Sequence, residues 1–213
     1  DISTTSFYAS HVITAGGCGG MVMFNDEEHL KRALMFRDWG RIGDNIEEPS
    51  ERFNHSVDGI PYDWKFLYGV AGYHLKACEM NAAFGLVQLD KLEGFLRKRR
   101  ENVERYIENL KDCSYYTLPN DSQTPNWLAI PLQCPDRLEI VNFLEKNDVQ
   151  TRVTFAGNIT RHPAFREYLG EFENADKIMK DGFLLGAHHG LDIEDVDRVC
   201  NLLKTFAATK VNA

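Results

Sequence analysis

The stretch Ser6–Gly20, with the sequence SFYASHVITAGGCGG, decides how the first part of the chain folds. Apolar runs at Ile2–Tyr8 and Met21–Phe24 flank it and predict two short strands. The segment between them contains four glycines and one imidazole, that of His11. A loop between two strands can hold a reactive side chain in the open, and glycine N–H groups could bind an anion. The glycine spacing alone matches neither a Walker loop nor a dinucleotide-binding fingerprint, so a purely structural turn is the alternative.

Composition limits the class of protein and its partners. The 213 residues are 43% hydrophobic and 26% charged, which fits a globular fold of one or two domains. A net charge of −8 and a single basic run, at Arg97–Arg100, argue against nucleic acid as a partner. Five cysteines without a CxxC pair indicate reduced thiols, a cytoplasmic location and no structural zinc. Neither a membrane-spanning run nor a signal peptide is apparent, so no membrane partner is expected.

Periodicity and turn residues predict the elements that follow. A helix over Glu27–Asp38, capped by Asn25 or Asp26, precedes a long acidic loop over residues 40–65 that includes Asp44. Residues 76–112 then form either one helix that connects two domains or two helices in sequence. The chain begins without Met and directly in a strand pattern, which indicates the middle of a longer protein.

Residues 113–213 predict a small α+β domain. Pro131 and Pro135 are expected to end its first strand, because proline has no N–H group to give to a sheet. The expected strands are Trp127–Ile130, Gln150–Phe155 and Phe183–Leu185, and the expected helices are Asp136–Lys146, Ala175–Asp181 and Ile193–Phe206. The domain division expected from the whole sequence is therefore 1–75, 76–112 and 113–213.

Four segments together resemble one family. They are Ser6–His11 with its double glycine, the RDWGR run at Arg37–Arg41, the GYHLK run at Gly72–Lys76, and the helix start at Glu79–Leu89. In combination they resemble the DegT/DnrJ/StrS sugar aminotransferases, which are fold-type I pyridoxal phosphate enzymes. The resemblance implies an α/β fold, namely the C-terminal part of an aspartate-aminotransferase-like fold: the end of the large-domain sheet plus a small α+β domain. It also implies pyridoxal 5'-phosphate or pyridoxamine 5'-phosphate as cofactor and a homodimer.

His11 distinguishes this chain within the family it resembles. Family aminotransferases have lysine at this position, because only an amine can form a Schiff base with the cofactor. Imidazole cannot, but it can act as a general base near neutral pH. Histidine here resembles the 3-dehydratase branch, which acts on nucleotide-linked 4-keto-6-deoxyhexoses. The resemblance implies that His11 removes a proton from the cofactor while the C3 hydroxyl of the sugar leaves.

The resemblance also implies roles for four other residues. Ser6 and His74 would bind cofactor phosphate, with His74 standing where the family has an asparagine that reaches the partner subunit's site. Asn158 and Arg161 would contact the nucleotide-sugar. The alternatives are a polar strand end for Ser6, a polar helix start for His74 and turn-capping roles for Asn158 and Arg161.

Two further features restrict the chemistry. The 3-dehydratase branch that the chain resembles has two sub-types. One holds an iron–sulfur cluster with cysteines, and it is not indicated here because the segment 41–62 contains no cysteine. The other sub-type takes its amino group from glutamate. His188 and His189 are adjacent, which matches no metal-ligand spacing.

The leading hypothesis is a pyridoxamine-phosphate-dependent nucleotide-sugar 3-dehydratase that serves deoxysugar and O-antigen-type polysaccharide synthesis. A nucleotide-sugar aminotransferase of the same family is the first alternative, which His11 argues against. A non-catalytic fragment that binds a partner chain is the second alternative. It is supported because this sequence matches only the C-terminal half of the family fold.

Overall fold

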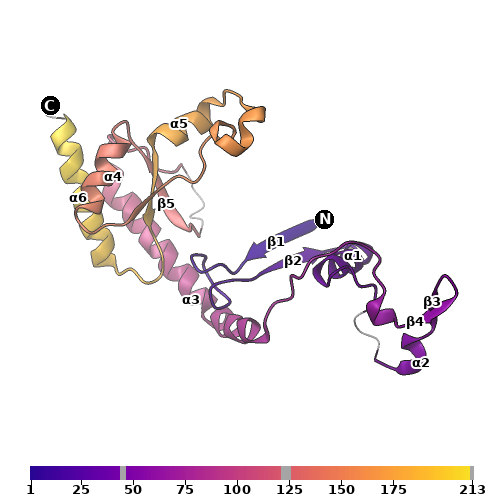
Figure 1. Cartoon of the computed structure of the whole chain (residues 1–213). Helices are drawn as coiled ribbons and strands as arrows, with labels where there is room; N and C mark the ends of the chain where they lie inside the picture. Colours follow the sequence, from indigo (N-terminus) through magenta and orange to yellow (C-terminus); the bar gives the residue numbers. More distant parts are fainter. Residues whose placement is uncertain (44–46, 121–125, 212–213) are drawn as a thin grey trace. The chain divides into compact units, whose positions relative to one another are not determined.

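The computed structural model describes residues 1–43, 47–120 and 126–211. The chain divides into two compact units, Asp1–Asp90 and Lys91–Ala213, and the division falls inside the long helix α3, Glu79–Leu110 (Figure 1). The three-part division expected from the sequence stays a prediction, and Asp44 lies outside the described residues.

The first unit begins with the two predicted strands. β1 (Ile2–Ser6) pairs antiparallel with β2 (Gly20–Phe24), and Ser6 lies opposite Gly20. The helix α1 (Glu27–Arg37) follows, and the Asp26 side chain caps it by accepting a hydrogen bond from the His29 N–H at 2.9 Å. The strand–loop–strand arrangement around His11 is therefore confirmed, and Asp26, one of the two predicted caps, is the one used.

The prediction of one long loop over residues 40–65 is wrong. A short helix α2 (Pro49–Arg52) is followed by a hairpin of β3 (His55–Val57) and β4 (Ile60–Tyr62) and by the 3-10 turn η1 (Trp64–Phe66). Asp58 and Gly59, with φ of 52° and 80°, form the two-residue turn that such a hairpin requires. An ion pair between Arg52 and Asp63 links α2 to the end of the hairpin. Strands of three residues are too short to show an alternating pattern.

The long helical segment is a single helix. α3 has 32 residues, which settles the choice between one helix and two. Its buried residues all lie in its second half, where they join the core of the second unit; they are Arg99, Asn102, Val103, Tyr106 and Leu110. Its first half exposes apolar side chains, including Met80 at 78% and Leu86 at 65%.

The second unit is a three-stranded antiparallel sheet covered by helices. The sheet order is β5 (Ala129–Gln133), β7 (Gly182–Gly186) and β6 (Thr151–Val153). The end of α3 packs against it together with α4 (Arg137–Glu145) and α6 (Ile193–Val211) (Figure 1). The segment between β6 and β7 contains two 3-10 turns and one helix: η2 (Ile159–Arg161), η3 (Pro163–Tyr168) and α5 (Glu173–Asp181).

Pro131 does not end its strand as predicted. β5 continues through Pro131 to Gln133, and Pro131 lies opposite Leu184 of β7. β5 is at the edge of the sheet order, and an edge strand tolerates proline because the missing N–H can face away from the neighbouring strand. The strand itself was expected, but its end was placed three residues too early.

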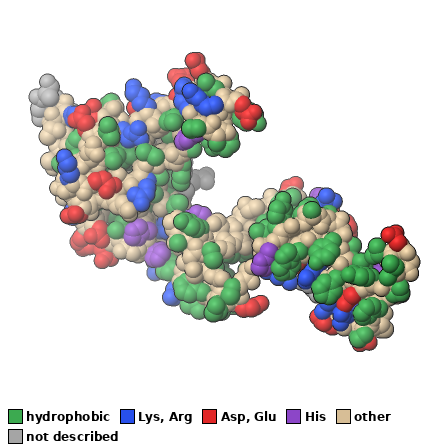
Figure 2. All heavy atoms as spheres, in the orientation of Figure 1, with side chains coloured by type: hydrophobic (Ala, Val, Ile, Leu, Met, Phe, Trp, Pro, Cys, Tyr) green, Lys and Arg blue, Asp and Glu red, His purple; other side chains and the backbone are tan. Residues whose placement is uncertain are grey.

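Apolar side chains are abundant on the surface of the first unit (Figure 2). Both faces of the β1–β2 hairpin are exposed, with Val22 on one face and Met21 on the other both at 52%, and Tyr73 and Leu75 are exposed at 64% and 67%. Among the described residues, no helix combines the length and the low polarity that crossing a membrane requires.

Candidate active site

The loop between β1 and β2 is held by its own hydrogen bonds. The Phe7 N–H donates to the Gly19 carbonyl at 2.9 Å, and the Ala9 N–H donates to the Gly17 carbonyl at 3.2 Å. The Thr14 hydroxyl donates to the Phe7 carbonyl at 2.8 Å and accepts from the Gly17 N–H at 2.8 Å. The loop is therefore an ordered platform for His11.

Glycine is required at three points of this loop. Gly16, Gly17 and Gly19 have φ of 70°, 100° and 110°, a region that residues with a side chain rarely adopt. Asn81, in the first turn of α3, donates to the Ala15 carbonyl at 2.5 Å. The glycines thus let the loop fold tightly, and Asn81 ties it to the start of the helix.

His11 is half-buried and oriented by its neighbours. Its backbone N–H donates to the Tyr8 carbonyl at 3.0 Å, and its Nδ1 lies 3.4 Å from the Ser6 carbonyl oxygen. A carbonyl oxygen can only accept a hydrogen bond, so this contact favours the tautomer that carries its proton on Nδ1 and has its lone pair on Nε2. This is the form in which an imidazole acts as a base.

Ser6 lies beside His11, and among the described residues no acceptor takes its hydroxyl hydrogen. The Ser6 Oγ accepts a hydrogen bond from the Tyr8 N–H at 3.2 Å, and the residue is exposed. Since its oxygen accepts in this bond, the hydroxyl can still donate to an anion. The structure therefore brings together two of the predicted site residues, Ser6 and His11.

His74 is placed by a different set of contacts. Its ring stacks on Trp39 at 4.5 Å between centroids with an interplanar angle of 9°, and the Arg41 guanidinium lies 4.8 Å from the Trp39 ring. Among the described residues, no hydrogen bond or ring contact joins His74 to Ser6 or His11. Its predicted contact with cofactor phosphate stays a prediction.

Asn158 caps the η2 turn, which is the alternative role that the sequence left open, and it makes further hydrogen bonds that the sequence did not reveal. The side chain is 2% exposed, and all of its polar capacity is used. Its amide donates to the Gly170 carbonyl at 3.0 Å and to the Asp176 carboxylate at 2.9 Å. Its oxygen accepts from the Thr160 N–H at 3.1 Å and the Thr160 hydroxyl at 2.6 Å. Asn158 thus holds the segment between β6 and β7 together, and its contact with substrate stays a prediction.

Arg161 is fixed by the same carboxylate. Its Nε donates to Asp176, and the hydrogen bonds from Arg161 and Asn158 hold the pKa of Asp176 well below its usual range. The Arg161 side chain remains 41% exposed. Sequence reasoning missed Asp176, because it lies 15 residues from Arg161 and no local pattern connects the two.

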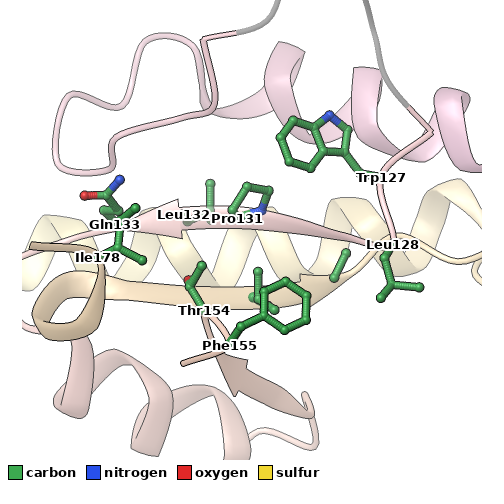
Figure 3. Close-up of a pocket in the computed structure, with 10 residues that line it drawn as sticks. Trp127, Leu128, Pro131, Leu132, Gln133, Thr154, Phe155 and Ile178 are labelled. Carbon is green, nitrogen blue, oxygen red and sulfur yellow. The ribbon is translucent and has the colours of Figure 1, made fainter. Parts of the chain in front are cut away.

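A cavity of about 290 Å³ lies beside β5 in the second unit (Figure 3). Its lining is mostly apolar and includes Trp127 and Phe155, while Gln133 and Thr154 are its polar members. Apolar cavities with a few polar groups are typical of small-molecule sites. In the described part of the chain, no three His, Cys, Asp or Glu side chains are placed to hold one metal ion.

Comparison with known proteins connects this geometry to a family. Residues 1–204 match the model of the DegT/DnrJ/EryC1/StrS aminotransferase family. The chain is 35% identical to the lipopolysaccharide biosynthesis protein RfbH of Salmonella typhimurium, over 97% of this chain and 51% of that protein. It is 33% identical to the dTDP-4-dehydro-2,6-dideoxy-D-glucose 3-dehydratase of Saccharopolyspora spinosa, over 98% of this chain and 48% of that protein.

A solved structure confirms the predicted fold class. The E. coli GDP-4-keto-6-deoxy-D-mannose-3-dehydratase, solved with bound hydrated PLP, superimposes with a TM-score of 0.81 at 22% identity, over 95% of this chain and 54% of that one. The chain spans about half the length of the curated relatives it matches. Because the family model covers nearly the whole of it, this chain belongs to the DegT/DnrJ/EryC1/StrS aminotransferase family.

Proposed function

We propose that the protein containing this chain is a nucleotide-sugar 3-dehydratase. It binds pyridoxal 5'-phosphate or pyridoxamine 5'-phosphate and removes the C3 hydroxyl of a nucleotide-linked 4-keto-6-deoxyhexose, with His11 as the base. The observation that carries the proposal is an imidazole on the β1–β2 loop whose Nδ1 faces the Ser6 carbonyl at 3.4 Å. The names of two similar proteins, a 3-dehydratase and a lipopolysaccharide biosynthesis protein, support the substrate class and a role in polysaccharide synthesis.

The residues around His11 fit the phosphate end of such a cofactor. The Ser6 hydroxyl can donate to a phosphate oxygen while its own oxygen accepts from the Tyr8 N–H. Apart from Gly17 and its two chain neighbours, no heavy atom of the described residues lies within 4 Å of the position where a Cβ on Gly17 would stand, so the backbone there is open to close approach. When bound, the cofactor supplies an electron sink for the carbon that loses its proton.

His11 holds and moves the proton. Its Nε2 lone pair accepts the proton, and the Ser6 carbonyl then stabilises the imidazolium through Nδ1–H. Imidazole has no primary amine for a covalent bond to the cofactor aldehyde, which favours dehydration over transamination. An aminotransferase of the same family is therefore the second candidate, and the family match and a more distant relative named as a transaminase support it.

Other residues have supporting roles in this proposal. Arg161, held in place by Asp176, binds the diphosphate of the nucleotide-sugar, and Asn158 acts through the segment it holds together. His74 binds phosphate across the interface of a homodimer. Glutamate regenerates the amine form of the cofactor, and the reaction takes place in the cytoplasm.

A deoxygenation assay tests the proposal. The full-length protein is incubated with pyridoxamine 5'-phosphate, glutamate and a GDP- or dTDP-linked 4-keto-6-deoxyhexose, and products are identified by mass spectrometry. We expect a product with hydrogen in place of the C3 hydroxyl, and we expect repeated turnover to require glutamate. His11→Asn should lower the rate by about 10²- to 10⁴-fold, the usual contribution of a general base.

The matched control is His29→Asn, since His29 is an exposed histidine on α1 with a side chain 63% exposed. It should turn over like the unmodified protein. A 4-amino sugar as the product would establish the aminotransferase instead. Full activity in the His11→Asn variant would remove His11 from the mechanism.

A further inference from the structure

The turn that follows α1 carries a tryptophan in an uncommon backbone conformation. Trp39 has a φ of 60°, in the left-handed region that bulky side chains rarely adopt. Gly40 follows at a φ of 96°, and a Cβ on Gly40 would stand 1.8 Å from the Val70 carbonyl oxygen. The turn is therefore packed backbone against backbone on residues 70–72, and this close approach keeps Trp39 in its strained conformation.

Backbone pairing places His74 beside the same turn. The Tyr73 N–H donates to the Phe36 carbonyl at 2.7 Å, and the Trp39 N–H donates to the Tyr73 carbonyl at 2.8 Å. An antiparallel bridge pairs Asp38 with His74. These contacts are made by the main chain, so the position of His74 beside the turn does not depend on its own side chain.

Stacking on Trp39 orients the His74 imidazole. The two ring centroids are 4.5 Å apart and the interplanar angle is 9°. The indole has a further neighbour, because the Arg41 guanidinium lies 4.8 Å from the Trp39 ring and 5.3 Å from the Phe66 ring. Stacking uses a face of the imidazole, whereas both of its nitrogens lie on the ring edge. His74 is exposed, so its ring is held in one orientation while its hydrogen-bonding edge stays accessible.

We propose that Trp39 is a positioning residue for His74, whose imidazole it holds ready to donate a hydrogen bond to cofactor phosphate. This inference rests on the proposed function, in which His74 binds that phosphate. A side chain that is already ordered loses less conformational freedom when the ligand binds, and such preorganisation raises affinity. Trp39 thus acts through His74 and not by a contact of its own with the cofactor.

The first test needs no cofactor. In full-length protein labelled at histidine, nuclear magnetic resonance should show the His74 ring protons upfield of those of the exposed His29, because the ring current of Trp39 acts on protons above its face. The His74 signal is identified by its absence in His74→Leu. The upfield shift should persist in Trp39→Phe and disappear in Trp39→Leu. A His74 signal that is the same in Trp39→Leu as in the unmodified protein would overturn the proposal.

A double-mutant cycle supplies the second test. Isothermal titration calorimetry measures the dissociation constant of the full-length protein for pyridoxamine 5'-phosphate. We expect Trp39→Leu to raise it about 3- to 10-fold, the usual effect of releasing one ordered side chain. Trp39→Phe should restore the affinity, and since Phe and Leu meet the same backbone strain, the difference between them reports the aromatic ring. In His74→Leu, adding Trp39→Leu should have no further effect.

Trp64→Leu is the matched control, because Trp64 stacks on His55 in the same unit at 3.7 Å and should not affect this affinity. An equal loss in this control, or the same effect of Trp39→Leu with and without His74, would overturn the proposal. Failure of the unmodified protein to bind the cofactor would reject the proposed function and this inference together. Binding that is unchanged in Trp39→Leu would reject this inference alone and leave the role of His11 standing.

Discussion

The Nδ1 atom of His11 lies 3.4 Å from the carbonyl oxygen of Ser6, the last residue of β1. This contact connects the end of a strand to the side chain on which the proposed chemistry depends. It favours the tautomer with the proton on Nδ1, because the carbonyl can only accept a hydrogen bond. Ser6 therefore contributes its backbone oxygen to the orientation of His11, and the proposed function assigns its hydroxyl to the cofactor phosphate.

The hydroxyl of Ser6 should contribute to cofactor affinity. Ser6→Ala removes a donor to phosphate and keeps the backbone carbonyl that orients His11. We expect the dissociation constant for pyridoxamine 5'-phosphate to rise about 10- to 100-fold, as for a lost hydrogen bond to a charged group. Isothermal titration calorimetry measures it, with Ser3→Ala on the same strand as the control. Equal affinities for the two variants would show that Ser6 does not bind the phosphate.

Asn158 should be important for stability. Asn158→Ala removes four hydrogen bonds from a side chain that is 2% exposed, and it leaves the Gly170 carbonyl and the Thr160 N–H without this partner. We expect a loss of about 2–4 kcal/mol in the free energy of unfolding, measured with urea. Asn201→Ala, at an exposed position on α6, should change it by less than about 0.5 kcal/mol. A similar small change for both variants would mean that the segment between β6 and β7 does not depend on Asn158.

Stability should fall on mild acidification. Burial lowers the pKa of His188 and of His189 in the folded protein. In mild acid the unfolded chain therefore binds more protons at these residues than the folded protein does. The contribution to stability is fully present above the unfolded-state pKa of about 6.5 and is lost as the pH falls through the lower folded-state values. The urea midpoint of unfolding should therefore fall as the pH is lowered through this range, and it should fall less in His189→Phe. An identical pH dependence in that variant would exclude His189 as the source.

The sequence predicted the elements that have a long, regular pattern. The β1–β2 hairpin around His11, the helical character of α3 and the strands and helices of the second unit all follow from apolar spacing over several turns or residues, whereas the choice between one helix and two over residues 76–112 was open until the structure showed α3. The β3–β4 hairpin was missed, because each strand has three residues and its stabilising contacts, such as the stacking of His55 on Trp64 at 3.7 Å, are tertiary.

Part of the candidate site was predictable because its residues are close together in the sequence. Ser6 and His11 are five residues apart on one loop, so their proximity is a local property. Asp176 and Arg99 act through partners that are 15 or more residues away, and no spacing in the sequence reports such contacts. Long-range hydrogen bonds from Asn158 and Asn102 likewise became visible only in the folded chain.

The central claim is that His11 occupies the position where family aminotransferases bind the cofactor covalently. The direct test is the absorbance of His11→Lys in the full-length protein after addition of pyridoxal 5'-phosphate, with His29→Lys as the matched control. We expect His11→Lys, after unbound cofactor is removed, to show the absorption band of a Schiff base, distinct from the bands of free pyridoxal 5'-phosphate, because its amine can condense with the cofactor aldehyde. The unmodified protein and the control should acquire none. Equal spectra for the two lysine variants would contradict the placement of His11 at the cofactor.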